Sequence, residues 1–199
     1  HRPSLSVNES GGLSGVLVSM GSSVFRVTPF VSVKQIDGRL SETETGEIII
    51  SSLKTDGYHR TPTELSQRRN VQEVTAGIVG KVHVGRLIVE AGHLEYRIEF
   101  PLQPEPRPYN IYYFRGDQMR NSWVACQGSL SNVFLFSEMA LNTSSTPAVT
   151  GGALFSAGGG AANMSLSYRY FPVDYFAPFG APFSESGNAA GESGVYAGL

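Results

Sequence analysis

Residues 94–100 read Leu-Glu-Tyr-Arg-Ile-Glu-Phe, and this stretch decides the fold class. Apolar and charged side chains alternate along it with a period of two, which is typical of a strand with one buried face and one wetted face. Further segments are rich in β-branched and aromatic residues and are predicted as strands. They are residues 24–33, 47–53, 80–90, 111–114, 122–125, 132–136 and 165–171. The sequence therefore predicts an all-β chain of about eight strands.

Turn signals separate the predicted strands. They are Asp37-Gly38, Asp56-Gly57, Ala91-Gly92, Gly116-Asp117 and the prolines at 101, 104, 106 and 108. Residues 151–162, GGALFSAGGGAA, favour a loop over the interior of a strand, because glycine loses the most backbone freedom on ordering. The loop contains no phosphate-binding spacing of glycines.

One short helix is predicted after the second strand. Thr61-Pro62-Thr63-Glu64 offers an N-cap threonine, a proline in the first turn and a glutamate where a capping box needs it. We expect this helix to run to about Asn70.

Length and composition indicate one core. The chain has 199 residues, 41% hydrophobic and only 16% charged, so it can bury a core but has few charges to wet its remaining surface. We expect an N-terminal arm over 1–15, a single domain over 16–183 and a flexible tail over 184–199. No apolar run approaches the ~20 residues of a membrane-spanning helix, and we expect a soluble chain without membrane contact.

The charge pattern argues against a nucleic-acid-binding groove. The net charge is −2, and the basic residues before Arg120 are nearly balanced by acidic ones. The densest basic stretch surrounds the predicted helix and comprises Lys54, Arg60, Arg68 and Arg69. These four residues are candidates for contact with RNA phosphates or a neighbouring subunit, and a solvated helix face is the alternative.

No catalytic or metal-binding signature is present. His59, His83 and His93 lack the spacing of a zinc helix, and no Cys/His cluster or nucleophile elbow occurs. A Ser-His-Asp triad could arise only by convergence in the fold. We expect no enzyme, no cofactor and no metal.

Arg115-Gly116-Asp117 has two interpretations. The tripeptide is one that integrins read in adhesive ligands, and it also suits an exposed hairpin turn between the predicted strands on either side. We favour the turn.

Eight strands, one inserted helix and no catalytic signature are typical of an antiparallel viral jelly roll. Residues 164–184, MSLSYRYFPVDYFAPFGAPFS, resemble the last strand and exit of the small coat proteins of plant picorna-like viruses, the comovirus, fabavirus and cheravirus group of the Secoviridae. The order of a strand, the turn at Ile36-Asp37-Gly38, the Thr61 helix and the strand at Gly80-Lys81 is similar to that group as well.

The resemblance implies a structural capsid subunit, cut from a polyprotein, of a non-enveloped icosahedral positive-strand RNA virus. Its partners would be copies of itself around fivefold axes, other coat proteins of a pseudo-T=3 shell and, weakly, the genomic RNA. It would reside in the virion, and in the host cytoplasm before assembly. The alternative is a receptor- or carbohydrate-binding β-sandwich such as a viral spike domain.

Overall fold

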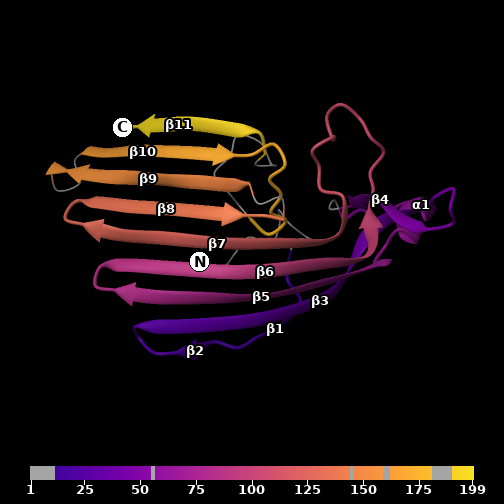
Figure 1. The fold of residues 1–199 in the computed structure, drawn as a ribbon, viewed down its shortest axis with the longest axis horizontal. Coiled ribbons are helices and arrows are strands. Elements are labelled where there is room, and N and C mark those ends of the chain that lie inside the picture. Colours follow the sequence, from indigo (N-terminus) through magenta and orange to yellow (C-terminus); the bar gives the residue numbers. More distant parts are fainter. Residues whose placement is uncertain (1–11, 55–56, 144–145, 159–161, 181–189) are drawn as a thin grey trace. The chain divides into compact units, whose positions relative to one another are not determined.

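The computed structural model describes residues 12–54, 57–143, 146–158, 162–180 and 190–199, and these residues form an all-β fold. Eleven strands join in one sheet and are accompanied by one short helix (Figure 1). The all-β class is confirmed, and the strands number eleven where about eight were predicted. The elements are β1 (Gly15–Leu17), β2 (Met20–Gly21), β3 (Phe25–Glu42), β4 (Ile48–Lys54), α1 (Pro62–Ser66), β5 (Val71–Val84), β6 (Leu87–Leu102), β7 (Gly116–Leu130), β8 (Val133–Leu141), β9 (Pro147–Ala157), β10 (Ala162–Phe171) and β11 (Glu192–Gly198).

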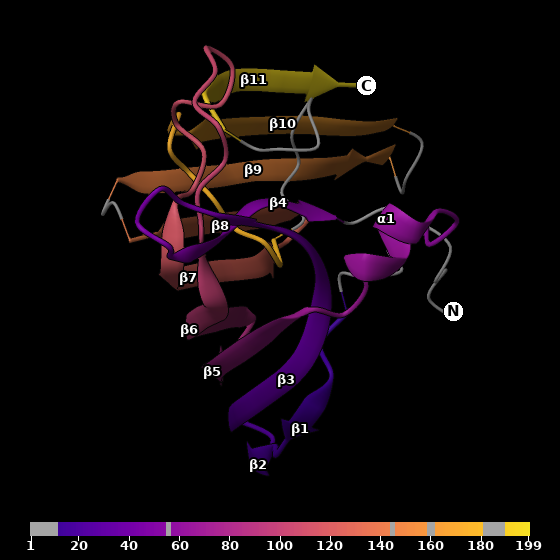
Figure 2. The same ribbon diagram turned by 90° about the vertical axis from the view of Figure 1, so that its right-hand side faces the viewer.

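The second half of the chain is a meander. The strand order is β1-β3-β4-β6-β7-β8-β9-β10-β11, with β2 on β3 and with β5 beside β3 and β6. Each strand from β7 to β11 pairs antiparallel with the next one along the chain. Figure 2 shows these five strands one above the other in chain order.

Contacts within the chain cluster in two compact units instead of the single core that we expected. Unit 1 comprises His1–Val16, Phe30–Ala76 and Glu95–Met119, and unit 2 comprises Leu17–Pro29, Gly77–Leu94 and Arg120–Leu199. Each unit is described by itself below.

The alternation over residues 94–100 is confirmed. Leu94, Tyr96 and Ile98 are buried, and β6 extends well beyond both ends of the predicted segment. Burial raises the pKa of the Tyr96 hydroxyl well above its usual range, and the adjacent Glu73 carboxylate adds to the effect. Glu73 in turn pairs with Lys34 at 3.2 Å, so unit 1 buries a charge pair beside its apolar core.

Two of the predicted turns lie inside long strands. Asp37-Gly38 falls within β3, where a Cβ on Gly38 would lie 2.7 Å from Cγ2 of Val71. Ala91-Gly92 falls within β6, where a Cβ on Gly92 would lie 2.2 Å from the Trp123 ring. These two glycines permit close packing against a neighbouring side chain and do not turn the chain.

Residues 80–90 were predicted as one strand but form a hairpin. The chain turns at Gly85, whose φ of 61° lies in the left-handed region, and β5 ends and β6 begins on either side of it. Residues 111–114 were also predicted as a strand and instead form a turn.

The glycine-rich stretch is mostly strand. β9 contains Gly151 and Gly152, and only residues 159–161 lie outside the described part. A Cβ on Gly152 would lie 2.5 Å from the Leu166 carbonyl oxygen and 2.7 Å from the Phe136 ring, so this glycine admits close neighbours on two strands. The loop prediction is wrong for residues 151–157.

The helix begins as predicted and ends early. Thr61 caps α1, and Glu64 completes the capping box. The helix stops at Ser66 instead of about Asn70, and Arg69 follows with a left-handed φ of 48°.

The predicted ends of the domain also change. Of the predicted arm, residues 1–11 lie outside the described part, and β1 begins at Gly15. Of the predicted tail, residues 184–189 lie outside it, and Glu192–Gly198 form β11 on the edge of β10. The predicted tail therefore contains a strand.

Candidate functional site

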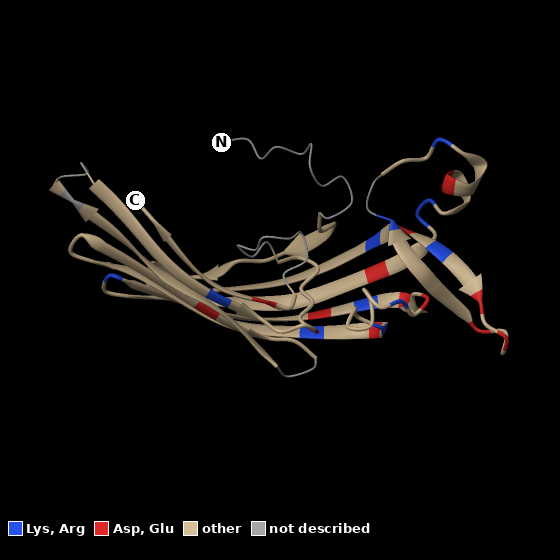
Figure 3. Cartoon of the chain, turned by 90° about the horizontal axis from the view of Figure 1, so that it is seen from above, with Lys and Arg blue, Asp and Glu red and all other residues tan. Residues whose placement is uncertain are grey.

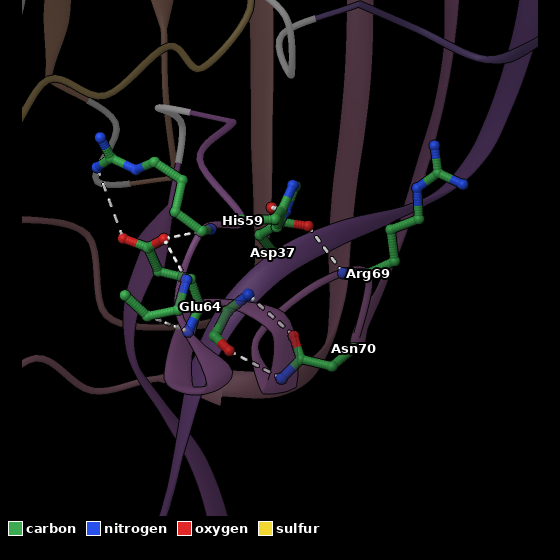
Figure 4. A network of polar contacts seen from close by, with 8 residues as sticks. Asp37, His59, Glu64, Arg69 and Asn70 are labelled. Carbon is green, nitrogen blue, oxygen red and sulfur yellow. Dashed lines mark hydrogen bonds and ion pairs between the residues drawn. The ribbon is translucent and has the colours of Figure 1, made fainter.

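A polar network surrounds α1 in unit 1 (Figure 4). Asp37 accepts a hydrogen bond from the Arg69 backbone N–H at 2.8 Å, and its other carboxylate oxygen lies 2.6 Å from Nε2 of His59. The Asn70 amide bonds both polar backbone groups of Gly38, at 2.9 and 2.8 Å. The network therefore fastens the chain on both sides of α1 to β3.

The four basic residues predicted as an RNA or subunit contact lie around this network. Arg60 pairs with Glu64 at 3.8 Å, and its guanidinium lies 4.1 Å from the centre of the Tyr58 ring. Arg68 and Arg69 are exposed, and Lys54 ends β4 opposite Asp37 in register. The structure thus gives Arg60 and the Arg69 backbone local roles, and the RNA or subunit contact stays a prediction.

Arg115-Gly116-Asp117 does not form the predicted hairpin turn. Gly116 begins β7, and Nη1 of Arg115 donates to the Pro104 carbonyl oxygen at 2.7 Å. The tripeptide therefore leads from a loop into a strand.

Histidine contacts occur at two separate places. His59 binds Asp37 in unit 1, and Nδ1 of His93 lies 2.8 Å from Oγ of Ser122 in unit 2. The acid–histidine and serine–histidine pairs thus use different histidines. No group of three or more His, Cys, Asp and Glu side chains that could hold a metal occurs among the described residues.

The most extensive surface feature of unit 2 is one face of the β7–β11 meander. Residues opposite each other in an antiparallel pair share a face, so the register places every side chain. We call this the apolar face, and it comprises Val124, Cys126, Gly128 and Leu130; Val133, Leu135, Ser137 and Met139; Val149, Gly151, Ala153 and Phe155; Met164, Leu166, Tyr168 and Tyr170; and Ser193, Val195 and Ala197.

None of these residues is charged, although most of the large ones are exposed. Leu166 is 50% exposed and Val195 70%. The first charge beyond the face on β7 is Arg120, which is also exposed. Figure 3 shows long stretches of the strands near the C-terminus without any charged residue.

The opposite face of the same strands carries the charges, and we call it the mixed face. It comprises Trp123, Ala125, Gln127 and Ser129; Phe134, Phe136, Glu138 and Ala140; Ala148, Thr150, Gly152 and Leu154; Ser165, Ser167, Arg169 and Phe171; and Glu192, Gly194, Tyr196 and Gly198. The two faces of one sheet therefore differ in charge, since the mixed face carries Glu138, Arg169 and Glu192.

Charged groups on the mixed face are partly buried. Arg169 of β10 forms an ion pair with Glu192 of β11. Burial raises the pKa of the Glu138 carboxyl, and the charge of Glu90 raises it further. Glu90 itself pairs with Lys81 at 2.9 Å.

Sequence reasoning missed the apolar face, although part of its signal was visible. Met164, Leu166, Tyr168 and Tyr170 alternate with polar residues along β10. In β7 and β9 the face includes glycine, cysteine and alanine, so no single strand reveals it. Only the register joins these weak patterns into one surface.

The one helix in the described part of the chain is too short to span a membrane.

Comparison with known proteins gives little guidance. No family model and no curated protein sequence matches the chain.

Among solved structures, the chain is similar to OmpT, an outer membrane protein of Vibrio cholerae in its trimer form. The identity is 10% and the TM-score 0.39, and the match covers 79% of this chain and 44% of that one. Because likeness at this level carries no argument, the interpretation below rests on the faces of the sheet.

Proposed function

We propose that the β7–β11 sheet of unit 2 is embedded in a membrane, with the apolar face in contact with lipid acyl chains. The observation that carries the proposal is the absence of charge across the apolar face of five paired strands, while the mixed face carries Glu138, Arg169 and Glu192. A strand that is apolar on one side and polar on the other has the pattern of a strand between lipid and a wet interior.

Strand length supports the proposal. A tilted strand needs about 9–11 residues to cross the hydrocarbon layer. β8 has 9 residues, β9 has 11 and β10 has 10. Each of the three therefore has the length of a membrane-crossing strand.

The connections fit the same arrangement. At one end of the meander, two residues join β7 to β8 and four join β9 to β10; at the other end, five join β8 to β9 and twenty join β10 to β11. Short turns on one side and longer loops on the other are common in membrane-spanning sheets.

Solvent alone is an unfavourable environment for the apolar face. Soluble monomers rarely expose continuous apolar patches larger than a few hundred Å². Each fully covered Leu, Met or Phe side chain contributes about 1.5–3 kcal/mol relative to exposure. We therefore expect a partner to cover the apolar face. Lipid acyl chains suit this role, because they are apolar and the face carries no charge.

The coat-protein function predicted from residues 164–184 is the second candidate. The same exposed face favours it, because neighbouring subunits would cover such a surface. A jelly roll packs two sheets through Greek-key connections, whereas β7 to β11 pair in chain order. This order differs from that of a jelly roll and therefore counts against the coat-protein candidate.

Single-tryptophan variants test the proposal. Trp123 is the only tryptophan, so Trp123→Phe gives a silent background. Leu135→Trp then places an indole on the apolar face, and Phe136→Trp places one on the mixed face of the same strand. In phosphatidylcholine vesicles with lipids brominated in mid-chain, we expect strong quenching and a blue-shifted emission for Leu135→Trp only.

Two results would count against the proposal. Equal quenching of both indoles would mean that the faces do not differ in lipid contact. If the protein stayed in the aqueous phase and formed closed particles under the electron microscope, the coat-protein function would replace it.

A further inference from the structure

The chain between β6 and β7, residues 103–115 of unit 1, forms a loop (Figure 1). Several of its aromatic side chains are exposed. Tyr109 is 68% exposed, Ile111 56%, Tyr112 57% and Tyr113 49%. The network around α1 and the membrane proposal use none of these four residues. Large apolar groups in solvent on one short loop mark a binding surface.

A buried asparagine fixes this loop. Asn110 is 5% exposed, its Oδ1 accepts the Arg107 backbone N–H at 2.8 Å, and its Nδ2 donates to the Glu105 carbonyl oxygen at 2.9 Å. The Tyr113 N–H donates to the Asn110 carbonyl oxygen at 3.1 Å. Since the bonds lie within the loop, its backbone is held in shape before any ligand arrives.

We propose that this loop, which we call the tyrosine loop, binds a neutral oligosaccharide. Sugar rings present apolar C–H faces that stack on aromatic rings, and hydroxyl groups that bond to polar side chains at the edge. Tyrosine supplies both a ring and a hydroxyl at little cost in side-chain entropy. Polar groups at the edge of the loop are available on Glu105, Arg107 and Arg115.

The small net charge of the loop indicates a neutral ligand. Its charged residues are Glu105, Arg107 and Arg115, a net charge of +1. Arg107 pairs with Glu105 at 3.0 Å, and Nη1 of Arg115 donates to the Pro104 carbonyl oxygen. A polyanion such as RNA would need an excess of basic side chains here, and a strongly cationic ligand would need an excess of acidic ones.

The small size of the loop favours a sugar over a protein. A stable protein interface uses about 20–30 residues on each side. The tyrosine loop spans residues 103–115, and its exposed apolar side chains lie within residues 109–113. A short oligosaccharide can be covered by a surface of this size.

The surroundings of the loop suit a site in water. The C-terminal part of β6, shortly before the loop, carries Glu95, Arg97 and Glu99 on the face opposite its buried residues. Charged side chains on this face indicate contact with water. This inference does not depend on the lipid contact of unit 2.

Isothermal titration tests the site with maltohexaose, cellohexaose and hexa-N-acetylchitohexaose, each up to about 10 mM. This range covers weak binding, since a Kd of 1 mM corresponds to only −4.1 kcal/mol. We expect at least one of the three to bind. Tyr112→Ala should weaken that binding about tenfold, Tyr112→Trp should preserve it and Asn110→Ala should weaken it by releasing the loop. Tyr58→Ala is the matched control, because Tyr58 is an exposed tyrosine outside the loop and should leave binding unchanged.

Three results would overturn the proposal. The first is no binding of any of the three hexaoses. The second is binding that Tyr112→Ala leaves intact. The third is self-association that depends on Tyr112, measured by analytical ultracentrifugation without sugar, because that result would assign the loop to a protein contact.

Discussion

At the scale of single residues, two asparagine side chains hold backbone segments in place by hydrogen bonds. Asn70 bonds the backbone of Gly38 inside β3, and Asn110 bonds the backbone of its own loop. An asparagine side chain carries both a donor and an acceptor, so it can pair both polar groups of a peptide. Neither residue had been singled out as structural.

Replacing Asn70 should destabilise unit 1. Asn70→Ala removes two partly buried hydrogen bonds and leaves the Gly38 carbonyl oxygen without its amide partner, at a cost of about 1–3 kcal/mol in the free energy of unfolding. Urea denaturation measures the loss. Asn132→Ala, at an exposed asparagine in unit 2 whose amide donates to the Ser156 carbonyl oxygen at 2.9 Å, should cost less. An equal loss would mean that the two bonds from Asn70 to Gly38 stabilise the fold no more than one exposed bond.

The capping box makes stability depend on pH through Glu64. The Arg60 backbone N–H lowers the pKa of this carboxyl below its ordinary value of 4.5. Desolvation opposes this effect in part, and the Thr61 N–H adds to it. Because the folded pKa is depressed, the stabilisation is present above the unfolded pKa. It is lost as the pH falls from about 4.5 through the folded pKa.

Glu64→Gln should remove this acid-side dependence. The difference in unfolding free energy between wild type and variant should be constant above about pH 5 and shrink below it. Urea denaturation across this range measures the difference, and an NMR titration of Glu64 should give a pKa below 4.5. A difference that grows toward acid pH would reverse the sign and exclude the capping role.

At the scale of elements, β11 is held to the sheet by one ion pair in addition to its ladder. Its sequence contains two glycines, a serine and an alanine, and therefore offers little apolar surface to bury. Arg169 on β10 is buried and pairs with Glu192 at the start of β11. A buried pair of this kind specifies register more than it adds stability.

Arg169→Met should detach β11 in part. The change leaves Glu192 partly buried without its cation, which costs about 3 kcal/mol. Hydrogen exchange should speed up at residues 193–198. The double variant Arg169→Met with Glu192→Met should recover most of the loss, whereas Arg68→Met, at an exposed residue, should change stability by less than about 0.5 kcal/mol. No recovery in the double variant would mean that the pair does not act as a unit.

At the scale of the whole molecule, the apolar face of unit 2 differs from the interior of either unit. Unit 1 buries Ile50, Val71 and Tyr96 beside the Lys34–Glu73 pair. In unit 2, the buried Ala148 and Phe171 lie on the mixed face with its partly buried charges. The large side chains of the apolar face are mostly exposed, and this exposure of a face without charge is what favours lipid as its environment.

Arginine substitutions test how much each face is destabilised by a buried or lipid-facing charge. In phosphatidylcholine vesicles, Leu166→Arg should destabilise the sheet by about 2–4 kcal/mol, the cost of a cation on a lipid-facing strand near mid-membrane. Ser165→Arg, one residue away on the mixed face, should cost less than about 1 kcal/mol. The unfolding free energy in vesicles provides the comparison, and similar losses at both positions would argue against lipid contact.

Local patterns in the sequence were sufficient for some elements. The alternation over 94–100 predicted a strand with one buried face, and the Thr61–Glu64 motif predicted a capped helix start. Both signals arise from contacts between residues close in the chain, so tertiary packing was not needed to read them. Membership of the all-β class followed from many such signals.

Other features depended on partners far away in sequence. Gly38 and Gly92 lie within strands because Val71 and Trp123 approach them there, and Gly152 lies within β9 because Leu166 and Phe136 do. The dipeptides Asp37-Gly38 and Ala91-Gly92 and the glycine-rich stretch usually indicate turns or loops. At these places close packing across the sheet keeps the chain extended instead. The early end of α1 likewise reflects the bond from Arg69 to Asp37.

By itself, the sequence determined that the chain forms strands, because alternation and β-branched residues act locally. The tertiary structure decided which strands pair and in what register, and thereby gathered short, individually weak patterns from β7 to β11 into one face without charge. A slip of one residue in any ladder would move that strand's side chains to the other face. The functional surface is therefore a property of the register, which no single segment of the sequence encodes.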